Sequence, residues 1–113
     1  MRFARRQGEV VGCVGCERHG DDALLRSLAV SETARSLGAG TALVRSLLAA
    51  LDAEGVRDVY LLTLDAARFF ERFGFEPIDR AALPNAIAGS REGVMHACDD
   101  AVPMRRDRAA SGR

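Results

Sequence analysis

The chain has no lysine, an odd number of cysteines, no net charge and no long apolar run. Its 16 acidic residues balance 16 basic ones, so charge gives no reason to expect nucleic acid or an anionic membrane as a partner. No run approaches the roughly 20 apolar residues of a membrane span, and the N-terminus lacks a signal peptide's apolar stretch. Three cysteines argue against a disulfide framework. We therefore expect one cytoplasmic domain in a chain of 113 residues.

Residues 1–104 are predicted to form this domain as an α/β fold, and residues 105–113 a disordered, Arg-rich tail. Residues 23–30 are apolar at most positions, with Leu24, Leu28 and Val30 on one face and Leu25, Ser27 and Ala29 on the other. This pattern predicts a central strand. The other predicted strands are residues 3–7, 10–17, 56–64, 75–78 and 101–104. The predicted helices are residues 41–54, residues 65–74 with Asp65 as N-cap, and one or two short helices within 80–97.

The most informative segment is Arg35-Ser36-Leu37-Gly38-Ala39-Gly40, between the strand at 23–30 and the helix at 41–54. Two glycines let a ligand approach the backbone closely, because no Cβ stands in the way. The following helix offers unpaired N–H groups and the positive end of its dipole, and Arg35 adds a guanidinium. The segment therefore predicts a phosphate site. An ordinary glycine-rich turn before a helix is the alternative.

This order of elements resembles the GCN-five-related N-acetyltransferases (GNAT). The matching segments are LAVSETARSLGAG at 28–40, YLLTL at 60–64 and ARFFERFGF at 67–75. The resemblance implies a mixed, mostly antiparallel GNAT-type sheet with flanking helices, and acetyl-CoA as co-substrate. The family's first strand and first two helices have no counterpart here, so we expect a form shortened at the N-terminus. Its open sheet edge predicts a homodimer or low stability.

The segments YLLT and FFERFGFEPIDRAALPNAI resemble the ArsN-type arsenic-resistance N-acetyltransferases and the acetyltransferase domain of N-acetylglutamate synthases. This resemblance implies an enzyme that acetylates the amino group of a small amino-acid-like acceptor, with a link to arsenic resistance or with glutamate as the acceptor. A coenzyme A-binding protein without catalytic activity is the alternative. Acetyl-CoA would stabilise both, but only the enzyme would release thiol when an acceptor is added.

The resemblance also implies which residues bind the cofactor. The R-x-x-G-x-G turn would hold the pyrophosphate, the end of the strand at 23–30 would bind the pantetheine arm and the thioester oxygen, and Phe70 would lie against the thioester. The predicted cofactor-binding residues are Leu28, Ala29, Val30, Arg35, Ser36, Leu37, Gly38, Ala39, Gly40, Thr41 and Phe70.

The catalytic acid and base stay unassigned, because the chain departs from the family at both positions. Phe70 replaces a tyrosine that protonates the leaving thiolate in many members, and Leu24 replaces a base glutamate of some members. Tyr60, the only tyrosine, is interpreted as a core residue. The nearby acids Asp21, Asp22 and Glu32 are interpreted as solvated turn residues.

Two other patterns suggest different functions. Cys13 and Cys16 form a C-x-x-C pattern that is shared with redox, zinc and arsenic sites, but residues three apart on a strand face opposite sides. Small buried cysteines are the simpler interpretation, Cys98 has no assigned role, and we expect no metal. Gly38 and Gly40 also match two of the three glycines of a dinucleotide-binding motif, but the opening hairpin disfavours that fold.

Overall fold

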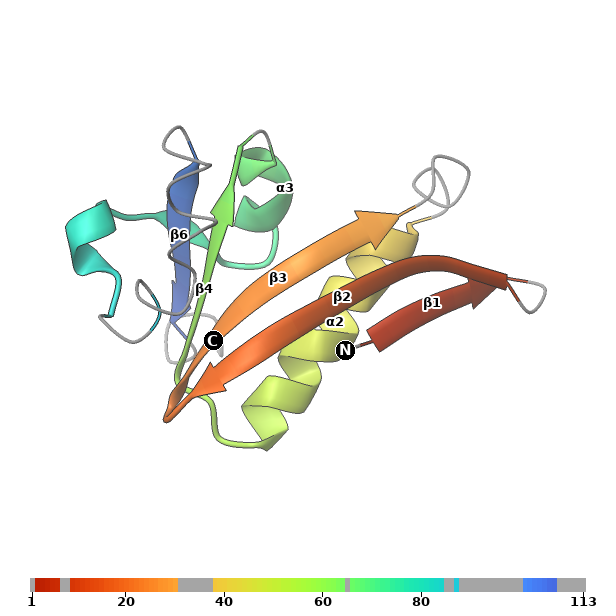
Figure 1. The fold of residues 1–113 in the computed structure, drawn as a ribbon, viewed down its shortest axis with the longest axis horizontal. Helices are drawn as coiled ribbons and strands as arrows, with labels where there is room; N and C mark the ends of the chain where they lie inside the picture. The colour runs from red at the N-terminus through yellow and green to blue at the C-terminus, as the bar shows by residue number, and fades with distance from the viewer. Residues whose placement is uncertain are drawn as a thin grey trace.

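The computed structural model describes residues 2–6, 9–30, 38–64, 66–84, 87 and 101–107. Six strands form one sheet in the order β1-β2-β3-β4-β6-β5, and helices α2 and α3 flank it (Figure 1). Only β3 and β4 pair in parallel, so the predicted mixed, mostly antiparallel sheet is confirmed. The elements are β1 (Arg2–Arg6), β2 (Glu9–His19), β3 (Asp22–Val30), α2 (Ala39–Ala53), β4 (Asp58–Thr63), α3 (Ala67–Glu71), β5 (Glu76–Pro77), a 3-10 turn (Arg80–Ala82) and β6 (Val102–Asp107).

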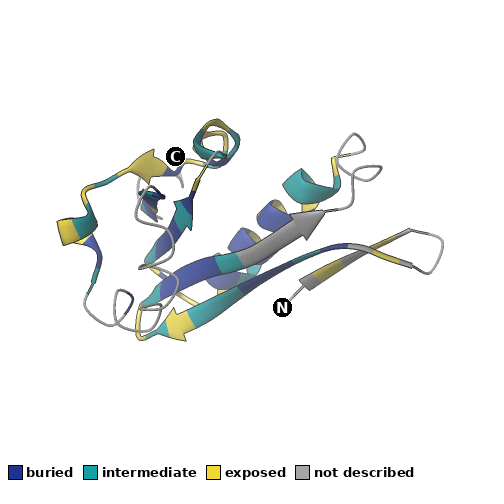
Figure 2. Ribbon diagram, turned by 45° about the horizontal axis from the view of Figure 1, so that its top comes forward, coloured by how far each residue is buried: buried dark blue, intermediate teal, exposed yellow. Residues whose placement is uncertain are grey.

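Helix α2 covers one face of the sheet and forms the main core with it (Figure 2). Its apolar positions recur at helical spacing, and all five of them are buried, as the sequence predicts: Leu43, Val44, Leu47, Leu48 and Leu51. Burying each such side chain contributes about 1.5–3 kcal/mol. The helix ends where Gly55 adopts a φ of 86°, a left-handed conformation that glycine reaches without strain.

The opposite face of the sheet carries a smaller cluster of buried residues, Leu24, Tyr60, Leu83 and Ile87. Leu24 contributes to this cluster, whereas its neighbour Leu25 contributes to the main core under α2. Strand β3 therefore buries apolar side chains on both faces, and it lies between β2 and β4. The prediction of a central strand at residues 23–30 is confirmed.

The sequence predicts a helix over residues 65–74 with Asp65 as its N-cap, but α3 spans only Ala67–Glu71 and its N-cap residue is Ala66. The residue preceding its first turn is Ala66, whose N–H donates to Thr63 Oγ1 at 3.0 Å. Asp65, the predicted N-cap, lies outside the described residues. Phe69 and Phe73 pack beside buried Phe70, with ring centroids 5.1 Å apart for Phe69 and Phe70 and 5.2 Å for Phe69 and Phe73. The Phe-rich side of this short helix thus faces the main core.

The end of the chain corrects a prediction. Residues 105–107 were assigned to a disordered tail, but they belong to β6, which pairs with β4 as far as Asp107. The physical reason is a partner on α2: Arg106 Nη1 and Nη2 donate to the two carboxylate oxygens of Asp52 at 3.1 and 3.0 Å. This bidentate ion pair lets Arg106 lie 92% buried, since it is only 8% exposed. Residues 108–113 lie outside the described residues.

Candidate acetyl-CoA site

Strands β3 and β4 pair over a short distance and then separate. Their parallel ladder joins Asp22, Ala23 and Leu24 to Asp58, Val59 and Tyr60, and it ends there. Strand β3 nevertheless continues to Val30 and β4 to Thr63, along diverging paths (Figure 1). The edge of β3 that follows Leu24 therefore extends beyond the ladder with β4. A ligand can pair with backbone groups on such an edge.

The register between β3 and β2 shifts by one residue just beyond the end of the β3–β4 ladder, after Arg26. Gly15 faces Arg26 and Cys13 faces Ala29, so the single residue Val14 lies opposite two residues of β3. This is the arrangement of a β-bulge, which bends a strand and redirects its side chains. The register of β3 with β2 therefore shifts within the segment for which the sequence predicts strict alternation. Leu28, Ala29 and Val30 form the last part of β3, as predicted.

Helix α2 begins at the end of the predicted phosphate segment. Gly38 is its N-cap residue, with a left-handed φ of 78°, and no side chain caps the helix. The first N–H that pairs within the helix is that of Ala42, which donates to Gly38 O at 3.0 Å. The N–H groups of Ala39, Gly40 and Thr41 therefore have no partner inside the helix. Among the described residues, no atom lies within 4 Å of a Cβ built on Gly38.

Together these features form a candidate site for an anionic ligand. The open N–H groups and the positive end of the dipole of α2 favour a phosphate group, and the open edge of β3 leads toward them. The helix begins two residues earlier than the sequence predicts: Gly38 is its N-cap residue, and Ala39, Gly40 and Thr41 form its first turn. The other predicted members of the turn, Arg35, Ser36 and Leu37, lie outside the described residues.

Comparison with known proteins identifies the fold and the family. Residues 2–77 match the acetyltransferase (GNAT) domain. The chain belongs to this family. It is 39% identical over 82 residues to an uncharacterized N-acetyltransferase of Chlorobaculum tepidum, a match that covers 72% of this chain and 52% of the relative. The chain thus spans about half the length of that curated relative.

Solved GNAT structures share the fold. The N-acetylglutamate synthase of Neisseria gonorrhoeae, complexed with coenzyme A and N-acetyl-glutamate, superposes with a TM-score of 0.80 at 20% identity. That match covers 93% of this chain and 24% of the synthase chain. A Mycobacterium tuberculosis protein in complex with coenzyme A superposes with a TM-score of 0.76 at 24% identity, covering 93% of this chain and 74% of the other.

Phe70 and Tyr60, the two aromatic residues considered for the site, are buried. Phe70 is 5% exposed, belongs to the main core and contacts Phe75 edge to face at 5.8 Å. Tyr60 is also 5% exposed and lies in the smaller cluster, so its interpretation as a core residue is confirmed. Burial raises the pKa of Tyr60, and the charges of Asp58 and Asp22 raise it further.

One of the acids interpreted as solvated turn residues, Asp22, is only partly exposed and belongs to a strand. Asp21 is exposed in the turn, but Asp22 is the first residue of β3, lies opposite Asp58 and is half-buried. Burial raises the pKa of Asp22, and the neighbouring charges of Asp58 and Asp21 add to this effect. Glu32, the third of these acids, lies outside the described residues.

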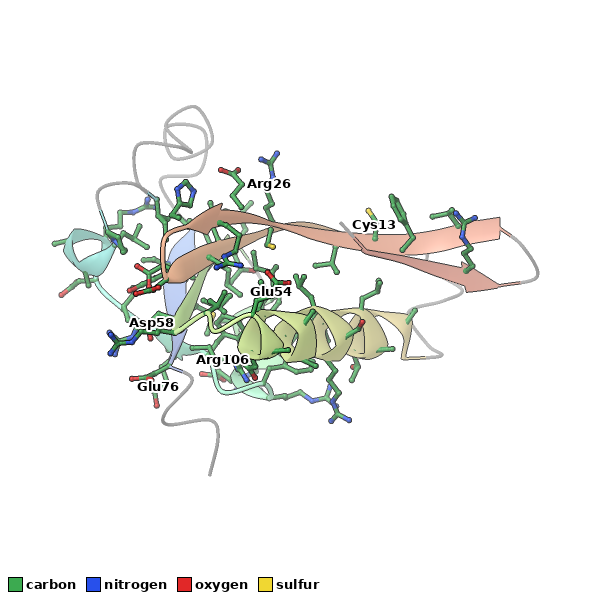
Figure 3. The ribbon with its side chains drawn as sticks, turned by 90° about the horizontal axis from the view of Figure 1, so that it is seen from below. Cys13, Arg26, Glu54, Asp58, Glu76 and Arg106 are labelled. Carbon is green, nitrogen blue, oxygen red and sulfur yellow. The ribbon has the colours of Figure 1, made fainter. Side chains whose placement is uncertain are left out.

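The two cysteines of the C-x-x-C pattern do not converge. Cys16 packs against the core under α2, whereas the side chain of Cys13 lies on the opposite side of the sheet (Figure 3). Among the described residues, no group of three or more His, Cys, Asp or Glu side chains could hold a metal ion. Cys98 lies outside the described part of the chain. In that same part, no helix is long and apolar enough to cross a membrane.

A groove of about 460 Å³ lies between α2 and the turn after α3. It is lined by Arg45, Leu48, Ala49, Asp52, Arg72, Phe73, Gly74 and Arg106. Its first lining residue on α2 is six residues beyond Ala39, which at 1.5 Å per residue is about 9 Å along the helix. The groove is therefore separate from the open N–H groups at the start of α2.

The sequence does not reveal one polar feature beside the site. Arg26 Nη1 on β3 donates to Glu17 Oε2 on β2 at 2.5 Å. Arg26 is the last paired residue of β3 before the register shift. Opposite charges on two adjacent predicted strands are the only signal that could have indicated this pair. Whether the two residues meet depends on strand register, which the sequence alone does not determine.

Proposed function

We propose that this domain transfers an acetyl group from acetyl-CoA to the amino group of a small amino-acid-like acceptor. The observation that carries the proposal is the start of α2, where no side chain caps the helix, beside the part of β3 that extends beyond its described ladder with β4. The N–H groups of Ala39, Gly40 and Thr41 would hold the pyrophosphate, together with the preceding residues from Arg35. Membership of the GNAT family and the resemblance to an N-acetyltransferase support this reading.

The reaction requires the acceptor nitrogen to attack the thioester carbonyl carbon while the carbon–sulfur bond breaks. The amine loses a proton and the departing thiolate gains one. The carbonyl oxygen carries negative charge in between, and an N–H at the end of β3, within Leu28 to Val30, would stabilise it by about 3 kcal/mol. Phe70 has no proton to give and would serve only as an apolar wall near the thioester. The thiolate would then be protonated from solvent or by the acceptor's own ammonium group.

An amino-acid-like acceptor is supported by resemblance. The segments at 60–63 and 69–87 resemble the ArsN-type arsenic-resistance enzymes, which suggests an acceptor with an arsinic or phosphinic group. The structural similarity to a synthase complexed with N-acetyl-glutamate makes glutamate the second candidate. The alternative is a protein that binds coenzyme A without turnover. The buried Phe70 supports it, because Phe70 stands where many family members have a tyrosine that protonates the thiolate.

The test measures binding and turnover separately. Acetyl-CoA at about 100 times its dissociation constant should add roughly 2.7 kcal/mol to the free energy of unfolding. Thiol release should then follow when L-glutamate or its phosphinic or arsinic analogues are added. Stabilisation without thiol release from any acceptor would support the non-catalytic alternative. An unchanged melting temperature with acetyl-CoA would refute both.

A further inference from the structure

The ion pair of Arg26 and Glu17 occupies a particular place on the sheet. Arg26 is two residues beyond Leu24, where the ladder between β3 and β4 ends, and it immediately precedes the register shift with β2. Its side chain is 38% exposed and that of Glu17 is 25% exposed. Arg26 therefore lies on the part of β3 beyond its ladder with β4, Glu17 lies on the neighbouring strand β2, and both side chains are partly exposed.

Arg26 lies on the face of the sheet opposite to α2. Leu25 packs into the core under α2 and Leu24 into the cluster on the other face, and Arg26 shares the face of Leu24 by alternation. Figure 3 shows the Arg26 side chain pointing away from α2. The residue directly across the ladder on β2 is Gly15, so no cross-strand side chain covers the base of Arg26.

This position suits the acceptor rather than the donor. The pyrophosphate site proposed above is at the start of α2, on one side of the sheet, and Arg26 points to the other side. The proposed thioester segment, Leu28 to Val30, begins two residues beyond Arg26, roughly 7 Å along the strand. An α-amino acid whose carboxylate lies on the Arg26 guanidinium can reach that segment with its amine.

We propose that Arg26 binds the α-carboxylate of the acceptor and thereby selects amino acids over amines without this group. Glu17 would be a positioning residue, which fixes the plane of the guanidinium through its ion pair. A planar fork matches a carboxylate through two parallel hydrogen bonds, which a lysine does not reproduce. This inference rests on the proposed acetyltransferase function and deepens it by naming the group that is recognised.

The test compares acceptors that differ only at the α-carboxylate. Four compounds are titrated into the full chain saturated with coenzyme A: L-glutamate, its phosphinic analogue, and the α-carboxamide of each. Calorimetry measures the dissociation constant of each compound. Arg26→Gln should weaken binding of both carboxylates by roughly 10- to 100-fold and change binding of the carboxamides by less than about 2-fold. Arg26→Lys should fall between the wild type and Arg26→Gln.

Arg18→Gln is the matched control, because Arg18 also belongs to an exposed ion pair, at 2.6 Å from Glu54 at the end of α2. It should leave all four dissociation constants unchanged. Equal weakening of carboxylates and carboxamides by Arg26→Gln would overturn the assignment, and so would a wild type that binds neither kind of acceptor. The transferase function itself fails by a different result, the absence of any stabilisation by acetyl-CoA.

Discussion

Two glycines at opposite ends of α2 provide a direct test of the phosphate site. Gly38 precedes the helix with a φ of 78° and Gly55 follows it with a φ of 86°, and an added Cβ would meet nothing within 4 Å at either position. Alanine at either site therefore introduces the same left-handed strain and no clash with the protein. That strain amounts to about 1–2 kcal/mol.

The expected shifts follow from the size of the domain. An unfolding entropy of about 2.1 cal/mol/K per residue gives roughly 240 cal/mol/K for this chain, or about 4 °C of melting temperature per kcal/mol. Gly38→Ala and Gly55→Ala should each lower the melting temperature of the unliganded protein by about 4–8 °C. In the wild type, acetyl-CoA at about 100 times its dissociation constant should raise it by about 11 °C.

Only Gly38→Ala should reduce that ligand shift. The added methyl group would stand in the open space where the pyrophosphate approaches the helix, and a weakened charge-assisted hydrogen bond is worth about 1.5–3 kcal/mol. The ligand shift at the same acetyl-CoA concentration should then fall by more than half, while Gly55→Ala keeps the full shift. Differential scanning fluorimetry with and without acetyl-CoA measures all four values. Equal ligand shifts in the two variants would refute a pyrophosphate at the start of α2.

Two further predictions concern the charged residues of the sheet. Asp52→Asn should lower the free energy of unfolding by about 2 kcal/mol, because it leaves the buried Arg106 without its carboxylate partner. Adding Arg106→Met should restore part of the loss. A change below about 0.5 kcal/mol in the free energy measured by urea denaturation would contradict this prediction. The pKa of Asp22 is raised above 3.8, so its contribution to stability is present at low pH and is lost as the pH rises through the folded pKa. Asp22→Asn should therefore gain stability relative to the wild type between about pH 3 and pH 7, and a difference that does not vary with pH would contradict the assignment.

Local periodicity explains why so much of the fold follows from the sequence. The five apolar residues of α2 recur at helical spacing and Gly55 ends the helix, so both features can be recognised within one segment. The start of α2 is partly local: the sequence predicts a helix after the glycine segment, although the helix begins at Ala39 rather than at Thr41. The use of its first N–H groups for a phosphate stays a prediction.

The features that the sequence did not reveal depend on partners far along the chain. In the sequence, residues 105–107 resemble a polar tail. Arg106 can be buried in a strand because the carboxylate of Asp52, 54 residues earlier, pairs with its guanidinium. The alternation along β3 looks continuous in the sequence, yet its pairing with β2 shifts after Arg26. A register shift is a property of two strands together, so one strand's pattern cannot predict it.

The shift in β3 also explains how one strand could serve two substrates. Before it, Leu24 and Leu25 follow strict alternation and fix β3 between two apolar clusters. At the shift, an extra residue bends the strand away from β4, and the ladder with β4 has already ended. The two faces of the sheet become reachable from a single open edge, with the start of α2 on one side and Arg26 on the other. A donor and an acceptor that approach from opposite faces can meet at this edge without competing for space, as transfer between two bound molecules requires.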